Sequence, residues 1–154
     1  MKSVIEKKKI YAGYINLKPI NGIIFPSYSQ NQINKDYITN QLFGEFFMST
    51  NENTYGKNNI VLRSLIEKKD IKGICLLSIF ALPENSNQRN KIYKMLIKNK
   101  KEFHFVFENR SLKSEKQIEG IEDYFIFNRK FFTVKKIKLS KFEKKILDTS
   151  WSFI

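Results

Sequence analysis

The stretch that constrains the fold most is Gly73–Arg89, in which an apolar run leads into the start of a helix. Residues Ile74–Leu77 contain no polar side chain, which is typical of a strand buried on both faces of a parallel sheet. The chain turns polar around Pro83, and Asn85 or Ser86 is a suitable helix N-cap. A strand that leads into a helix places their connecting loop at the carboxyl edge of the sheet, where open α/β folds hold their sites.

The remaining apolar runs and periodic segments extend this unit in both directions. We expect strands at Ile10–Ile15, Phe46–Met48, Ile74–Leu77 and Glu102–Glu108, and helices at about 27–42, 58–68, 86–99 and 114–127. Gly44 is expected to end the first helix. The order βαβαβαβα predicts a single three-layer α/β domain with a mainly parallel sheet of four to five strands and right-handed crossovers.

The pattern changes after Asn128, so we assign residues 1–128 to the α/β domain and 129–154 to a basic C-terminal extension. Phe131–Leu139 could add an edge strand and Lys141–Leu147 a short amphipathic helix. The extension is expected to pack on the domain or on a partner subunit. A homo-oligomer and a partner enzyme are both compatible with it.

The net charge of the 154-residue chain is +13, which by itself favours a nucleic-acid partner. Ten of these thirteen charges lie in residues 1–9 and 129–145, outside the expected α/β core. A composition rich in Lys, Asn and Ile is also what AT-rich coding produces. Binding of nucleic acid through the basic termini is therefore kept as the alternative.

The single cysteine, Cys75, lies inside the central apolar run and cannot form an internal disulfide. No apolar segment approaches the roughly 20 residues that cross a bilayer, and Met1–Lys9 is not followed by the apolar region of a secretory signal. We expect a cytoplasmic protein without a membrane span.

Familiar catalytic signatures are absent from the sequence. It has no P-loop, no Gly-x-Gly-x-x-Gly, no His-Glu-x-x-His and no paired cysteines. One histidine cannot build an ordinary histidine-based zinc site. We therefore expect no metal and no cofactor, and whether the chain is an enzyme stays open.

Polar residues after the expected strands should meet at the carboxyl edge of the sheet. The expected ligand-binding residues are Asn16, Lys18, Gln30, Asn31, Ser78 and Arg89; the candidate acid or base residues are Glu84 and Glu108, with His104 as a supporting partner. The cations, together with the amino end of the first helix, suit a phosphate, sulfate or carboxylate.

Each candidate also has a structural interpretation. Gln30 and Asn31 can cap the first helix, and Arg89 can form a surface pair with Glu84, worth less than about 1 kcal/mol. Ser78 can be a cap, because no adjacent base is evident for a nucleophile. His104 can be a core histidine whose hydrogen bonds are satisfied.

Residues from Tyr11 to Phe127 resemble the sporadically distributed proteins of bacterial carbohydrate biosynthesis gene clusters. The resemblance rests on Gly13-Tyr14-Ile15, Lys18-Pro19-Ile20-Asn21-Gly22, Gln30-Asn31 and Phe103-His104-Phe105, and most specifically on Ser78-Ile79-Phe80-Ala81-Leu82-Pro83-Glu84. That family usually has Arg at the position of Lys18. The resemblance implies a role near surface-polysaccharide or modified-sugar synthesis and supplies no known reaction.

A weaker resemblance, in element order, is to the catalytic domain of serine recombinases (resolvases), and it implies a resolvase- or flavodoxin-like fold. In those enzymes the nucleophilic serine closely follows the first strand, where this chain has Asn16-Leu17-Lys18. Phe80–Glu84 replaces their arginine-rich segment, which argues against recombination. The function expected from the sequence is binding of, or action on, an anionic sugar or sugar nucleotide at the carboxyl edge of the sheet.

Overall fold

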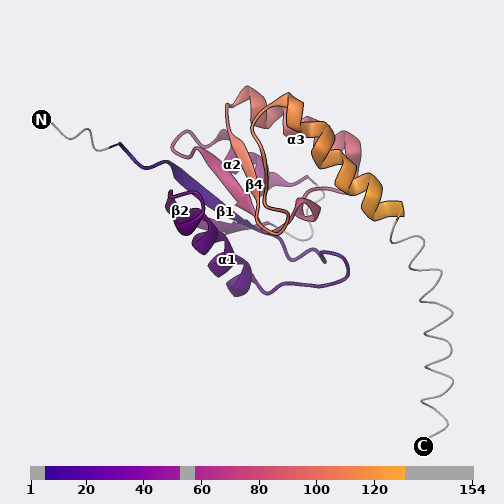
Figure 1. Cartoon of the computed structure of the whole chain (residues 1–154), viewed down its shortest axis with the longest axis horizontal. Helices are drawn as coiled ribbons and strands as arrows, with labels where there is room; N and C mark the ends of the chain where they lie inside the picture. Colours follow the sequence, from indigo (N-terminus) through magenta and orange to yellow (C-terminus); the bar gives the residue numbers. More distant parts are fainter. Residues whose placement is uncertain (1–5, 53–57, 131–154) are drawn as a thin grey trace, which may run out of the picture. The chain divides into compact units, whose positions relative to one another are not determined.

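The computed structural model describes residues 6–52 and 58–130, and Figure 1 shows their course. Of these, residues 6–52 and 58–118 belong to one compact unit and residues 119–130 to another. The first unit contains a five-stranded sheet and three α-helices. Its elements are β1 (Ile10–Ile15), α1 (Ser27–Asn40), β2 (Glu45–Asn51), α2 (Ile60–Glu67), β3 (Gly73–Leu76), η1 (Ile79–Ala81), α3 (Ser86–Lys98), β4 (Glu102–Phe105), β5 (Arg110–Leu112) and η2 (Glu115–Gln117).

The sheet has the strand order β2-β1-β3-β4-β5. The first four strands in this order run parallel, and β5 pairs antiparallel with β4. The expected mainly parallel sheet of four to five strands is therefore confirmed. β3 lies at its centre and is buried at every residue, as the apolar run predicted.

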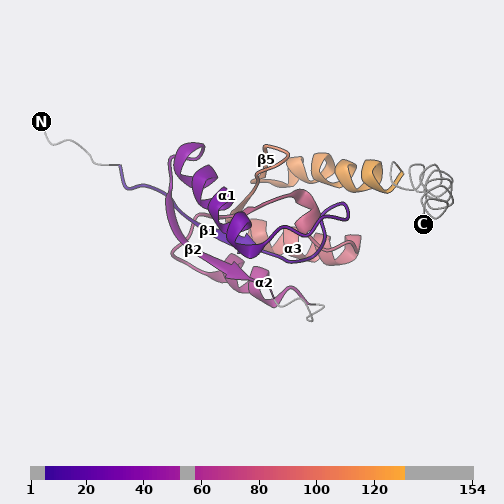
Figure 2. The ribbon, with the colours of Figure 1, turned by 90° about the horizontal axis from the view of Figure 1, so that it is seen from below.

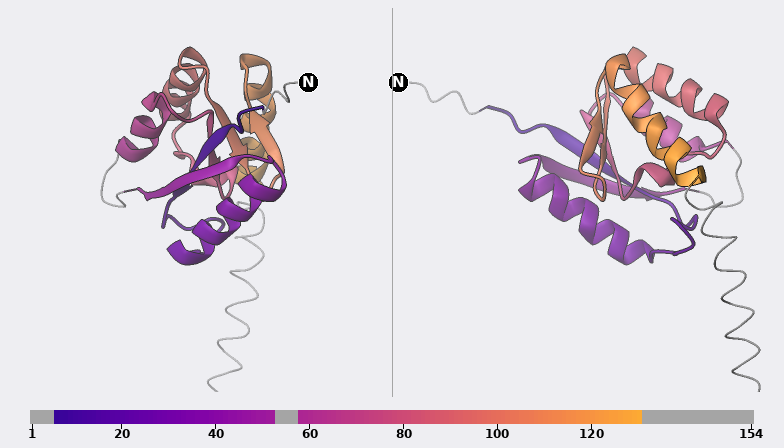
Figure 3. Two further views of the ribbon diagram at one scale, coloured as in Figure 1. Left: turned by 90° about the vertical axis from the view of Figure 1, so that its left-hand side faces the viewer. Right: turned by 45° about the vertical axis from the view of Figure 1, so that its right-hand side comes forward.

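Helices cover both faces of the sheet and give the first unit three layers. In Figures 2 and 3, α1 lies on one face, and α2 and α3 lie together on the other. Parallel strands joined by such helices bury an apolar core on each face of the sheet. Because β1, β2, β3 and β4 run parallel, they all end at the same edge of the sheet. The loops that follow these four strands therefore lie at this carboxyl edge.

Two details of the expected elements were wrong. The fourth strand ends at Phe105 instead of Glu108, because residues 106–109 form a turn in which Asn109 has a left-handed φ of 48°. This turn reverses the chain into β5, which the sequence did not predict. The first helix ends at Asn40 with Gln41 as its C-cap, and the residue after it that takes a left-handed φ, of 51°, is Phe43. Gly44 is instead required for space, since a Cβ there would lie 2.6 Å from the Tyr11 ring.

β2 contains a bulge at Phe47, because Tyr11 and Ala12 of β1 pair with Phe46 and Met48. Phe46 packs on the α1 face against Tyr11, whereas the Phe47 ring lies under the ammonium group of Lys68 at the end of α2. A bulge adds one residue to one strand of a pair and locally shifts the alternation of its side chains.

The expected fourth helix is present over residues 118–130, after the single turn η2. The strand expected at 131–139 and the helix expected at 141–147 lie outside the described residues, as does most of the basic extension. No helix within residues 6–52 and 58–130 has both the length and the apolar character that a membrane span requires.

Candidate functional site

Gln30, in the first turn of α1, fixes the end of β1. Its Oε1 accepts a hydrogen bond from the Asn16 backbone N–H at 3.2 Å, and its Nε2 donates to the Asn16 carbonyl oxygen at 2.9 Å and to the Phe25 carbonyl oxygen at 2.7 Å. A side-chain amide has both donors and an acceptor, so it can satisfy a backbone residue on both sides. Gln30 is 1% exposed, and its amide is used in holding Asn16.

Asn16 connects β1 to the loop after β3. Its Nδ2 donates to the Ala81 carbonyl oxygen at 3.3 Å and lies 3.4 Å from the Tyr14 hydroxyl, while its Oδ1 accepts from the Lys18 backbone N–H at 2.9 Å. The last of these bonds is a local turn of the kind that asparagine favours. The side chain therefore sets the direction in which Lys18 leaves the strand.

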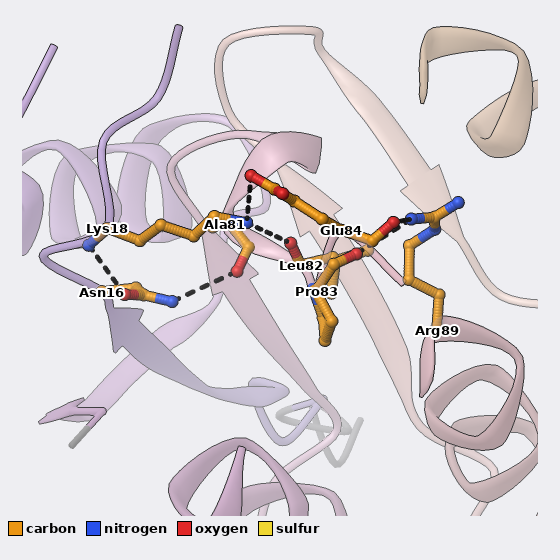
Figure 4. A network of polar contacts seen from close by, with 7 residues as sticks. All are labelled: Asn16, Lys18, Ala81, Leu82, Pro83, Glu84 and Arg89. Carbon is orange, nitrogen blue, oxygen red and sulfur yellow. Dashed lines mark hydrogen bonds and ion pairs between the residues drawn. The ribbon is translucent and has the colours of Figure 1, made fainter. Parts of the chain in front are cut away.

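Lys18 reaches across the carboxyl edge from β1 to the segment after η1, as Figure 4 shows. Its Nζ donates to the Leu82 carbonyl oxygen at 3.4 Å and lies 3.5 Å from Oε1 of Glu84. The two side chains are 30% and 85% exposed. The structure brings Lys18 and Glu84 together at this edge, and both side chains are accessible to a ligand.

Ser78 and Glu108 are also brought together, and their contacts organise η1. The Ser78 hydroxyl donates to Glu108 Oε1 at 2.5 Å and accepts from the Phe80 N–H, and Glu108 Oε2 accepts from the Ile79 N–H at 3.0 Å. This is the arrangement of an N-cap, which pairs the first N–H groups of a helical turn. Ser78 has the capping role that the sequence left open.

Arg89, in the first turn of α3, is 2% exposed and lies beneath the loop. Its Nη1 donates to the carbonyl oxygens of Pro83, at 2.9 Å, and Glu84, at 2.7 Å (Figure 4). The guanidinium therefore contacts the backbone of Glu84. The surface ion pair between the Arg89 and Glu84 side chains, which the sequence suggested, is not what positions the guanidinium. A buried Arg89 holds the loop that carries Glu84 and does not present its charge at the edge.

Asn31 is half-buried one residue beyond Gln30, and its side chain forms no hydrogen bond with another described residue. The structure therefore leaves its amide available. The N-cap position of α1 is occupied by Pro26, which supplies no side-chain cap. Neither Gln30 nor Asn31 is therefore the N-cap of the first helix that the sequence suggested.

His104 belongs to another network, on the face of the sheet that α1 covers. Its Nε2 lies 2.9 Å from Glu102 Oε1, the same oxygen that accepts from the Tyr11 hydroxyl at 2.9 Å, and its ring meets the Tyr11 ring edge-on. Burial raises the pKa of Glu102, but the hydrogen bonds from His104 and Tyr11 outweigh it and lower this pKa from 4.5 to about 2. His104 is 3% exposed, as a satisfied core histidine would be.

Cys75 is also buried beside this network. Burial, and then the charge of Glu102, raise the pKa of its thiol far above the ordinary value. A thiol in such surroundings stays protonated and unreactive at neutral pH. This agrees with the packing role expected from the sequence.

Glu52, directly after β2, was missed by the sequence reasoning. Its carboxylate accepts hydrogen bonds from the Tyr14 hydroxyl at 3.0 Å and from the N–H groups of Val61, at 3.3 Å, and Leu62, at 3.1 Å. These N–H groups belong to the first turn of α2, where a carboxylate is favourable. Its position just after a strand was the available signal, but the strand was expected to end at Met48, four residues earlier.

The geometry supports ligand binding at the carboxyl edge more directly than catalysis. Lys18, Glu84 and Asn31 keep accessible polar groups, while Asn16, Gln30, Ser78, Glu108 and Arg89 are engaged in holding the loops. Within residues 6–52 and 58–130, no three His, Cys, Asp or Glu side chains come close enough together to hold a metal ion.

Comparison with known proteins shows the fold. The chain is similar to the N-terminal catalytic domain of TP901-1 integrase, with a TM-score of 0.56 and 12% identity over 82% of this chain and 99% of that one. It is also similar to a resolvase family site-specific recombinase from Streptococcus pneumoniae, with a TM-score of 0.59 and 10% identity over 85% of this chain and 95% of that one. No protein-family model and no curated protein matches the sequence. The resolvase-like α/β fold is confirmed, and a likeness at this identity carries no further.

Proposed function

We propose that this chain binds an anionic sugar or sugar nucleotide at the carboxyl edge of its sheet, as a protein of bacterial surface-carbohydrate or modified-sugar biosynthesis. The observation that supports the proposal best is the position of Lys18, whose partly exposed ammonium group lies between a carbonyl oxygen and an exposed carboxylate. The proposed contact is between this ammonium and a phosphate or carboxylate of the ligand.

An incoming anion can replace Glu84 at little cost. Exposed ion pairs contribute at most about 1 kcal/mol, because solvent screens both charges. Glu84 is 85% exposed and its carboxylate is 3.5 Å from the ammonium, so the pair is of this weak kind. A phosphate group carries more charge and more acceptor oxygens than the carboxylate that it would displace.

The surroundings of Lys18 are held in place before a ligand arrives. Gln30 ties the Asn16 backbone to α1, and Asn16 in turn binds the backbone of Lys18 and Ala81. A binding group held on such a network loses little conformational entropy when the ligand binds. Asn31, which follows Gln30 in α1 and has an unpaired amide, is the group proposed to donate to a sugar hydroxyl.

The choice of a sugar as the ligand comes from the sequence resemblance of residues 11–127 to proteins of carbohydrate biosynthesis clusters. Of the candidate acid and base residues, Glu84 is the carboxylate that stays accessible, so it is the group proposed to take part in any proton transfer. Glu108 and His104 are proposed to act through structure, since both are engaged in internal hydrogen bonds.

The test is calorimetric titration of the chain with uridine diphosphate glucose and with glucose 1-phosphate. Lys18→Met keeps the apolar part of the side chain and removes the charge, and Lys35→Met on the exposed side of α1 is the matched control. We expect Lys18→Met to weaken binding at least about tenfold, which is about 1.4 kcal/mol. We expect Lys35→Met to have no effect.

Glu84→Gln gives a result of opposite sign. Removal of the competing carboxylate should tighten binding of the same probes, by up to about fivefold for an exposed pair worth at most about 1 kcal/mol. Equal affinities of the Lys18→Met and Lys35→Met proteins, or no binding of either probe, would show that the ligand site is elsewhere.

A further inference from the structure

We propose a second anion site, on the helices α2 and α3, that binds a chain of consecutive phosphate groups. A groove of about 960 Å³ lies between these helices, on the face of the sheet opposite α1. It is lined by Asn58, Ile60, Arg63, Ser64, Glu67, Lys91, Lys94, Met95 and Lys98. All of these residues belong to the first compact unit.

The groove carries an excess of positive charge. Arg63 comes from α2, Lys91, Lys94 and Lys98 come from α3, and Glu67 is the carboxylate among the lining residues. Within the described residues, none of these four cations forms a side-chain hydrogen bond or an ion pair. Their charges are therefore not neutralised within the described fold, and they are directed at one depression.

Arg63 gives an independent indication of a ligand. Its Nε is shielded from solvent but has no hydrogen-bond partner. A buried donor without a partner is unfavourable, and such an atom calls for an explanation. A phosphate in the groove would supply the missing acceptor if the guanidinium turned toward it, and guanidinium groups bind phosphate with two parallel hydrogen bonds.

The arrangement of the lysines favours an extended anion over a single phosphate. Positions 91, 94 and 98 follow the spacing that places side chains on one face of a helix. At 1.5 Å per residue they span about 10 Å along α3. A single phosphate would be bound best by cations that converge on one point. Cations spread over two helical turns are better suited to several phosphates in a row.

The lining also indicates how such a ligand would be recognised. It contains no aromatic side chain, so it offers no surface on which a base could stack. Recognition would therefore depend on phosphate groups alone and be independent of base sequence. A nucleic-acid strand and a small inorganic polyphosphate share this chemistry, and the experiment below distinguishes them.

The test measures binding of a fluorescein-labelled single-stranded oligonucleotide of about 20 nucleotides to the full chain, by anisotropy at several salt concentrations. The groove variant carries K91Q, K94Q and K98Q. The control variant carries K35Q, K69Q and K116Q, three exposed lysines outside the groove, and changes the net charge by the same amount. Circular dichroism and melting curves establish that both variants are folded.

We expect the groove variant to bind the oligonucleotide at least about tenfold more weakly. The slope of log K against log salt should fall in magnitude by about 2, because three phosphate contacts are lost at about 0.7 each. Arg63→Met should weaken binding as well, and the control variant should keep its affinity. Tripolyphosphate should compete with the oligonucleotide. If tripolyphosphate binds in the groove and the oligonucleotide does not, the ligand is a small polyphosphate.

Equal losses in the groove and control variants would overturn the proposal, because binding would then follow overall charge. Full affinity in the groove variant would overturn it too, because the basic termini would then be sufficient. Lys18→Met leaves the groove intact and should not change oligonucleotide binding, so the two proposed sites fail or succeed separately.

Discussion

The carboxylate of Glu102 should make folding more favourable as the pH rises from about 2 to about 5. Glu102 is 7% exposed and is hydrogen-bonded to Tyr11 and to His104. These bonds hold its pKa at about 2, below the ordinary value of 4.5. Between these two values the unfolded chain binds more protons than the folded chain, so raising the pH favours the folded state.

The size of the effect follows from the shift. A difference of one pKa unit corresponds to 1.36 kcal/mol, so a shift from 4.5 to about 2 corresponds to about 3 kcal/mol. This contribution is complete above the unfolded-state pKa and is lost as the pH falls through the folded-state pKa. Glu102→Gln cannot ionise, so its stability should lack this component.

The assay is urea unfolding of the wild-type and Glu102→Gln proteins, followed by far-ultraviolet circular dichroism between about pH 2.5 and about pH 6. The free energy of unfolding of the wild type minus that of Glu102→Gln cancels the contributions of other carboxylates. This difference should grow by up to about 3 kcal/mol as the pH rises over this range. Tyr11→Phe removes one of the bonds that lower the pKa, so its stability should depend less on pH. A difference that stays constant with pH, or that is larger at the acidic end, would refute this account of Glu102.

Two further predictions concern the loops and turns. Arg89→Met should lower the free energy of unfolding by about 2–6 kcal/mol, because two backbone carbonyl oxygens would lose their donor at about 1–3 kcal/mol each; an unchanged urea midpoint would show that solvent replaces these bonds. Gly44→Ala should cost about 1–3 kcal/mol because its Cβ would overlap the Tyr11 ring. Gly120→Ala is the matched control, because nothing lies within 4 Å of its Cβ, and in the helix at 118–130 it should stabilise by up to about 1 kcal/mol. Calorimetric melting of both glycine variants measures these opposite signs.

Sequence patterns predicted most of the fold because the apolar runs are distinct. The central strand and the helix after it were found from Ile74–Leu77 and Asn85, which accepts a hydrogen bond from the Gln88 N–H as an N-cap should. The turn at 106–109 was missed because Val106 and Phe107 are β-formers. Their N–H groups still bind the Leu76 and Leu77 carbonyl oxygens, so the pattern of a strand continues where the strand itself has ended.

For the candidate residues, the sequence indicated where polar side chains gather but not how each side chain is used. Strand order predicts which polar residues reach the carboxyl edge, and Lys18 and Glu84 do meet there. Pattern alone cannot tell whether a polar side chain faces solvent or the backbone of its own loop. Arg89 and Gln30 both turn inward, because unpaired carbonyl and N–H groups in buried loops must find partners.

The bulge in β2 has a consequence for how the chain can change in length. Phe46 and Ser49 both contact the α1 side of the sheet, although residues three apart face opposite sides of a regular strand. The extra residue at Phe47 makes this possible, so a deletion at that position would leave Phe46 and Ser49 two apart and on the same face. A deletion at Ser49 or later in the strand would instead exchange the faces of the residues on one side of it. Within β2, natural variants one residue shorter should therefore have lost Phe47 or Met48.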